Sequence, residues 1–178
     1  MEQHWQAWLD AAGREDIDAL IRSLYADIDA AVTERSPVCN ASGRCCRFEE
    51  FGHRLYVTGL EIAWFLLRVR NWDFGIGAER GKSGEPGVSL TQLAPTPNPQ
   101  LLIPNCPYQI DGLCSTHAIR PLGCRVYFCE KGTEDWQQDT TEHFLSRLKQ
   151  LHADHGLPYV YMEWRHGLAE AEQALSAD

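Results

Sequence analysis

Cysteines are the residues of this chain best suited to chemistry, and they fall into two groups along the sequence. The first group lies in CNASGRCC, where two cysteines are adjacent, and the second is spread over NCPYQIDGLCSTHAIRPLGCRVYFCEKG. In chain order they are Cys39, Cys45, Cys46, Cys106, Cys114, Cys124 and Cys129. Single thiols on separate loops converge when something gathers them, and a soft metal with thiolate ligands is the usual reason. We therefore expect the two groups to meet around a metal ion or cluster.

Two kinds of centre fit this pattern of thiols. Structural zinc takes four ligands, and iron–sulfur clusters also commonly take four. Zinc sites commonly use paired cysteine knuckles, whereas cysteines that are spread singly suit a cluster at least as well. Both kinds of centre fit the cysteines of this chain. Their spacing favours an iron–sulfur cluster, of the 4Fe-4S kind, over zinc.

Arginines lie next to the cysteines, although the chain as a whole carries a formal net charge of −9. They are Arg44, Arg47, Arg120 and Arg125. Four thiolates leave either kind of centre with negative charge, which guanidinium groups would offset while donating hydrogen bonds to sulfur. The alternative is that these arginines lie there by chance or serve solubility.

The expected compartment is the cytoplasm. The first residues, MEQHWQAWLDAAGRED, have no basic stretch followed by an apolar run, so we expect no secretory signal. Cytoplasmic thiols stay reduced, and an odd number of cysteines fits a disulfide framework poorly. No apolar stretch is long enough to span a bilayer, and the acidic balance disfavours binding to nucleic acid or anionic lipid.

Several segments together resemble a known family. CNASGRCC, VTGLEIA, CPYQIDGLC and HAIRPLGCR follow the order and spacing of the YkgJ-type cysteine-cluster family, the zinc- or iron-chelating domains with a CxxCxxCC signature. The resemblance runs from about Cys39 to Arg125. It implies a metal-binding domain whose ligands come from Cys39, Cys45, Cys46, Cys106, Cys114 and Cys124. Arg120 and Arg125 fall on the family's R-P-x-x-C-R segment, and we expect them beside the cofactor.

The chain departs from that family at three positions. Ser42 stands where the family has its second cysteine, His117 stands where an aromatic residue is usual, and Cys129 is an additional thiol. Either His117 or Cys129 would replace the missing ligand, or the site does not use that position. We expect Cys129 to be a packed residue, because its segment RVYFCEK is apolar, and His117 to be a hydrogen-bonded side chain. Of the adjacent pair, we expect one cysteine to ligate the metal while its neighbour points elsewhere.

Helices must position the two cysteine groups. Apolar spacing predicts a long helix over 14–36, and Thr58 with Glu61 forms a capping box that opens a second helix over 58–72. The expected C-terminal helices cover 134–156 and 167–177, and a shorter one precedes Gly13. Short strands are expected at 53–57, 88–93 and 159–164, and Asp111-Gly112 predicts a turn. We expect His143, His152, His155 and His166 to be solvated.

The predicted fold class is mainly α, with a small α+β arrangement as the alternative. Residues 1–178 are expected to form a single domain, because hydrophobic residues make up 44% of the chain and no boundary is visible. Its metal-binding core would cover 39–129, with cysteine-rich loops packed among flanking helices at 14–36 and 134–176.

Three functions from different classes fit these features. The first is an iron–sulfur protein that transfers electrons or uses its cluster in a small enzyme. The second is a structural zinc protein that presents a surface to a protein partner. The third is a metal-handling or thiol-redox protein that uses its surplus cysteines reversibly. No reaction or catalytic residue is predicted, and no G-x-G-x-x-G follows a strand.

Overall fold

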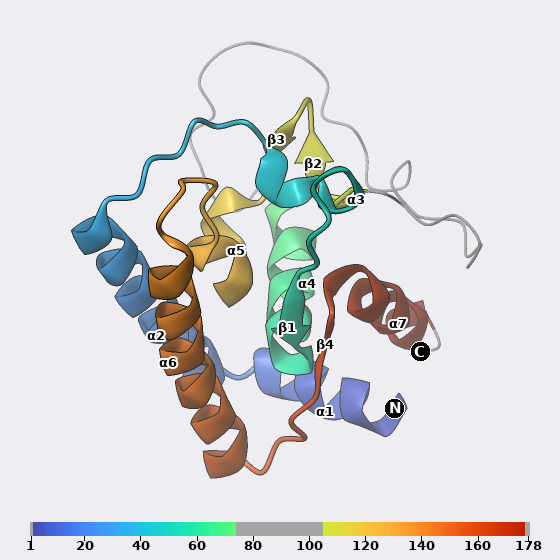
Figure 1. The fold of residues 1–178 in the computed structure, drawn as a ribbon. Helices are drawn as coiled ribbons and strands as arrows, with labels where there is room; N and C mark the ends of the chain where they lie inside the picture. Colours follow the sequence, from blue (N-terminus) through green and yellow to red (C-terminus); the bar gives the residue numbers. More distant parts are fainter. Residues whose placement is uncertain (1, 74–104, 177–178) are drawn as a thin grey trace.

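The computed structural model describes residues 2–73 and 105–176, which are mainly α-helical, as predicted, and include two short antiparallel ladders (Figure 1). The helices are α1 (Glu2–Ala12), α2 (Glu15–Arg35), α3 (Phe48–Phe51), α4 (Gly59–Asp73), α5 (Leu122–Val126), α6 (Glu134–Asp154) and α7 (Trp164–Ser176), with 3₁₀ turns η1 (Arg44–Cys46) and η3 (His117–Ile119). The strands are β1 (Tyr56–Thr58), β2 (Gln109–Ile110), β3 (Leu113–Cys114) and β4 (Tyr161–Glu163).

Helix α4 stands at the centre of the described fold, with α2 and α6 on one side and α7 on the other (Figure 1). Its residues from Leu60 to Leu66 are all buried, so the first two turns of this helix are covered all round. Gly59, at its start, allows α1 to approach closely, because a Cβ there would lie 2.4 Å from the ring of Trp8. The capping box predicted the beginning of this helix correctly.

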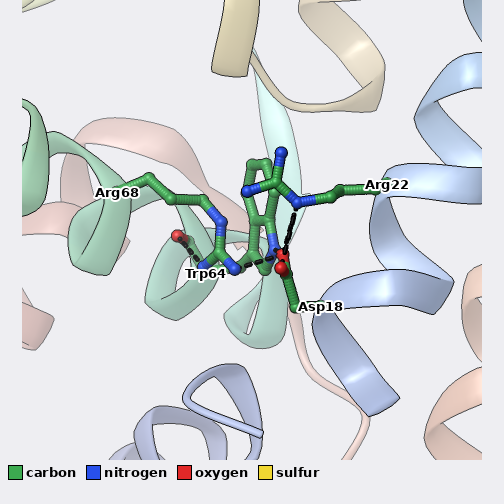
Figure 2. Close-up of polar contacts among 4 residues, drawn as sticks. All are labelled: Asp18, Arg22, Trp64 and Arg68. Atoms are coloured by element: carbon green, nitrogen blue, oxygen red, sulfur yellow. Dashed lines mark hydrogen bonds and ion pairs between the residues drawn. The ribbon is translucent and has the colours of Figure 1, made fainter. Parts of the chain in front are cut away.

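Helix α2 is held against α4 by a polar cluster around one carboxylate (Figure 2). Asp18 accepts hydrogen bonds at 2.9 Å from the indole N–H of Trp64 and from Nε of Arg22, and it also pairs with Arg68. The Arg68 guanidinium lies 4.0 Å from the centroid of the Trp64 ring, in cation–π contact. The other face of α2 packs through Ile17, Ile21, Leu24 and Ile28, which have the helical spacing that predicted it.

Strands β1 and β4 tie the middle of the chain to its C-terminal part. Val57 faces Met162 in this antiparallel ladder, and the backbone N–H of Trp164 donates to the carbonyl of Leu55 at 2.9 Å. The strands predicted at 53–57 and 159–164 are therefore present, but they occupy shorter spans. The strand predicted at 88–93 lies outside the described residues.

Strands β2 and β3 form a hairpin that the sequence predicted only as a turn. Asp111 and Gly112 both have positive φ, 50° and 79°, as the two central residues of a type I′ turn require. The register pairs Gln109 with Cys114, so the hairpin carries one of the cysteines directly.

Glu61 joins three parts of the fold through its buried carboxylate, which is 1% exposed. Beyond closing the capping box with Thr58, it accepts hydrogen bonds from the backbone N–H of Leu122 at 2.9 Å and from the Tyr25 hydroxyl at 3.1 Å. Burial raises the pKa of Glu61, and these donors oppose that rise. Glu61 therefore fixes the start of α5 relative to α2 and α4.

The prediction of solvated histidines is wrong for His152. This residue is 1% exposed, its Nδ1 lies 2.8 Å from the carbonyl oxygen of Pro158, and its ring meets Tyr159 edge to face. It sits on the buried face of α6 together with Leu148 and Leu151, one turn and one residue before it. Burial lowers its pKa, so the neutral ring is the form that the fold accommodates.

None of the helices in the described part of the chain combines the length and the apolar character that crossing a membrane requires.

Replacing Glu61 with alanine tests its role in joining the helices. Four buried donors, two on Thr58 and one each on Leu122 and Tyr25, lose their acceptor, so we expect Glu61→Ala to lower the free energy of unfolding by about 3 kcal/mol. Glu142→Ala on the exposed side of α6 is the control and should change it by less than about 0.5 kcal/mol. Urea unfolding measures both, and a loss below about 1 kcal/mol for Glu61→Ala would contradict this role.

Candidate metal centre

The two cysteine groups meet through their backbones. The N–H of Cys106 donates to the carbonyl of Cys46 at 2.8 Å, which joins residues that lie far apart in the sequence. Next to this bond, the Gln109 side-chain amide donates to the carbonyls of Gly43 at 2.9 Å and Gly112 at 3.2 Å. These contacts hold the first cysteine segment against the β2–β3 hairpin.

Gly43 makes this approach sterically feasible. Its φ is +66°, and a Cβ at this position would lie 1.8 Å from the carbonyl oxygen of Gly112. No side chain fits in that space, and the left-handed backbone also disfavours any residue other than glycine. The conformation places Cys45 and Cys46 on η1, which directly follows Gly43.

Five of the seven thiols lie together at this junction. They are Cys45, Cys46, Cys106, Cys114 and Cys124. The sulfurs of the adjacent pair are 3.9 Å apart, and the Cys46 thiol also faces the sulfurs of Cys106 and Cys114. The expectation that the two adjacent side chains diverge is therefore not met, since both turn toward the same group of sulfurs.

Shared protons change the acidity of these thiols. Cys46 keeps its proton, and its pKa is raised because its S–H is directed at neighbouring sulfurs, Cys106 first. Hydrogen bonding from Cys46 lowers the pKa of Cys45 to about 7 and that of Cys114 to about 6. The pKa of Cys106 falls for the same reason, with a contribution from the indole of Trp164. Thiolates are therefore available near neutral pH, as metal ligation requires.

Cys124 reaches the group from α5. This short helix begins at Leu122, whose N–H is held by Glu61, and it lies so close to Leu55 that a Cβ on Gly123 would be 2.5 Å from the Leu55 Cδ1. Burial raises the pKa of Cys124, and the nearby thiolates of Cys106 and Cys114 add to the rise. Without a cation in the group, Cys124 is therefore protonated.

The two arginines predicted beside the cofactor take different positions. Arg120 is partly buried near the sulfurs of Cys124 and Cys114; burial lowers its pKa and the charge of those sulfurs opposes the lowering. Its Nε is buried and has no hydrogen-bond partner among the described residues. Arg125 instead directs its donors to the framework: to Asp29 at 2.7 Å, and to the carbonyls of Arg120 and Ala118 at 2.8 Å each.

The remaining predicted residues lie apart from the five gathered cysteines. Cys39 is exposed and makes no hydrogen bond to any described residue. Its neighbour Val38 donates its N–H to the Glu130 carboxylate at 2.9 Å, which places the Cys39 segment beside that of Cys129. Cys129 is also exposed, so the prediction that it packs in the core is wrong. Val126, three residues earlier, is buried and Phe128 is partly buried, while Cys129 itself faces out.

Ser42 and His117 have other neighbours in the structure. The Ser42 hydroxyl accepts a hydrogen bond from the N–H of Arg44 at 3.4 Å. His117 lies near Arg120, Arg125 and Asp29, where burial and the two guanidinium charges lower its pKa. Within the described ranges, no three His, Cys, Asp or Glu side chains are already arranged closely enough to hold a metal ion.

Sequence reasoning missed several residues that build this junction. Gly43, Gly112 and Gln109 carry no metal-binding chemistry, and only the Asp-Gly turn pointed to any of them. His53 was not considered either, although its Nε2 lies 3.3 Å from the carbonyl oxygen of Cys45.

Comparison of the chain with family models, curated proteins and solved structures finds no match.

A methyl group at Gly43 tests the close approach of the two segments. We expect Gly43→Ala to lower the free energy of unfolding by more than about 3 kcal/mol, because it combines an unfavourable φ with a clash against the Gly112 carbonyl. Gly52→Ala is the matched control, since Gly52 has φ +65° but a Cβ added there would have no atom within 4 Å; it should lose only about 1 kcal/mol. Equal losses in urea unfolding would show that the approach is looser than described.

Proposed function

We propose that this chain is a cytoplasmic metal-binding protein that holds an iron–sulfur cluster, of the 4Fe-4S kind, or a metal ion through cysteines from both of its cysteine segments. One observation carries the proposal: the fold gathers five thiols from η1, the start of the hairpin segment, β3 and α5. Four thiolates are what either kind of centre requires.

The electrostatics of the group support a bound cation. Cys45 and Cys114, with pKa values of about 7 and 6, place negative charge near Cys106 and Cys124 in a partly buried site. Thiolates so close to each other repel, and a metal cation converts that repulsion into attraction. The gathering of these side chains is thus an arrangement that a metal would stabilise.

Arg120 fits the same proposal. Its buried Nε lacks a partner among the described residues and its charge acts on the sulfurs of Cys124, Cys114 and Cys45. Guanidinium groups near metal-bound thiolates offset their negative charge and donate hydrogen bonds to sulfur. In this role Arg120 would orient and stabilise ligands, whereas Arg125 supports α5 from behind.

The spacing of the adjacent cysteines gives the zinc alternative a specific basis. Two sulfurs bound about 2.3 Å from one tetrahedral zinc lie about 3.8 Å apart, and those of Cys45 and Cys46 are 3.9 Å apart. A structural zinc site of this kind would fix the hairpin against η1 and present the surrounding surface to a protein partner. The resemblance of CNASGRCC and HAIRPLGCR to the YkgJ-type family supports either centre.

Replacing gathered cysteines tests the proposal. We expect Cys114→Ser and Cys124→Ser each to lose most of the bound metal and to unfold more easily, because metal-binding energy is coupled to folding. Cys129→Ser is the control and should keep its metal, since Cys129 is exposed and lies outside the group. The measurement is metal and acid-labile sulfide content after anaerobic purification. Unchanged metal in both variants would refute the proposal.

Cys39→Ser in the same assay separates two ligand sets. Retained metal assigns the site to the five gathered cysteines, as the exposure of Cys39 leads us to expect. Lost metal would show that the Cys39 segment folds onto the site when metal binds. Sulfide in proportion to iron, with a brown colour, identifies a cluster, whereas colourless protein with one zinc identifies the alternative.

A further inference from the structure

A cavity of about 190 Å³ opens beside the gathered cysteines. Cys45 and Cys124 form part of its wall, and the rest comes from α3, β1, α5, α6, β4 and the residues that directly follow α3 and α5. No carboxylate is among the described residues that line it, while Arg54 and His53 are. The cavity is thus a distinct space that adjoins the proposed metal centre.

Rings make up much of the cavity wall. His53 stacks on Tyr127 with centroids 4.9 Å apart and planes within 13°, and Phe48 meets the His53 ring edge to face at 5.4 Å. Tyr56 and Tyr161, paired across the β1–β4 ladder at 5.8 Å, are both partly exposed and line the same space. Walls of this composition favour a flat, mainly apolar occupant.

The tautomer of His53 determines what polar group the occupant needs. Its Nε2 lies 3.3 Å from the carbonyl oxygen of Cys45, and a carbonyl oxygen only accepts hydrogen bonds. Nε2 therefore carries the proton, and in the neutral ring Nδ1 is an acceptor. That Nδ1 is buried and has no hydrogen-bond partner among the described residues, so the cavity reaches it only when the His53 ring turns. A bound molecule with an O–H or N–H group would satisfy it.

The volume of the cavity matches an occupant with one ring. Liquid water takes about 30 Å³ per molecule, so the space corresponds to about six waters. Sites for drug-sized ligands and larger cofactors begin at about 300 Å³. A phenol-sized molecule fits this limit, and a nucleotide does not.

We propose that this cavity binds a small single-ring aromatic molecule with a hydroxyl or N–H donor, which donates to His53 Nδ1 and packs its ring among His53, Tyr127 and Tyr56. The inference rests on the proposed function in one respect: the occupant then lies next to a metal held by Cys45 and Cys124. The ligand class inferred for the cavity is a neutral aromatic molecule that donates a hydrogen bond.

Phenol is the probe, and anisole, which lacks the hydrogen-bond donor, is the control compound. Titration of the protein as purified, followed by amide NMR, should shift signals of Leu55, Tyr127 and Thr141, which line the cavity. Phenol should bind about threefold to tenfold more tightly than anisole, which is what one hydrogen bond to a buried acceptor contributes.

A variant with a larger side chain on α6 tests whether phenol binds in the cavity. Thr141 lines the cavity, so Thr141→Phe should weaken phenol binding at least about tenfold. Gln138→Phe places the same side chain on an exposed position of this helix and should leave binding unchanged. If the amide spectrum of Thr141→Phe shows a disrupted fold, Thr141→Leu is used instead.

Several results would overturn the inference: no shifts at 10 mM phenol (a concentration about tenfold above a millimolar Kd), shifts that map elsewhere, equal affinity for anisole, or full binding by the Thr141 variant. Metal analysis of the same samples keeps the two proposals apart. Phenol binding by protein without metal would leave the cavity as a binding site and count against the proposed function. Metal-loaded protein that does not bind phenol would support the proposed function and refute the binding site in the cavity.

Discussion

The close approach of Gly43 to Gly112 is the constraint on which the rest of the site depends. It allows a backbone hydrogen bond between Cys106 and Cys46 and lets Gln109 bridge both glycine carbonyls. Any side chain at Gly43 would push the hairpin away from η1, and Cys114 and Cys106 would then move away from Cys45 and Cys46. The thiols therefore meet because two backbones can touch where neither has a side chain.

The helical frame supplies the fifth thiol and keeps the group in place. Glu61 fixes the start of α5 and hence Cys124, while Arg125 anchors the other side of that helix to Asp29 on α2. The β1–β4 ladder holds Leu55, against which Gly123 packs. Buried polar groups that are fully hydrogen-bonded specify one arrangement, because each alternative leaves a donor or acceptor unsatisfied. These polar contacts thus set the position of the Cys124 sulfur, although Cys124 itself makes none of them.

Periodicity and capping predicted the helices because these features are local. The spacing of Ile17, Ile21, Leu24 and Ile28 and the Thr58–Glu61 pair are visible in the sequence, and the structure places both as expected. The approach of the two cysteine segments was also expected from the sequence, since single thiols on separate loops suggested a shared ligand.

What the sequence did not reveal depends on contacts between distant segments. Nothing local distinguishes Cys39, which is exposed, from Cys45, which faces the group, because the difference arises from the path of the chain through Gly43. His152 looked like a solvated helix residue, and only the carbonyl of Pro158 gives its ring a buried partner. The hydrogen bond that Glu61 accepts from the N–H of Leu122 was equally invisible beside its local capping role.

X-ray absorption spectroscopy at the metal edge of anaerobically purified protein tests the central claim most directly. Ligation by the gathered thiolates predicts a first shell of sulfur atoms at about 2.3 Å, for zinc and for cluster iron alike. A first shell of nitrogen and oxygen alone, or folded protein with five free thiols and no bound metal, would contradict it.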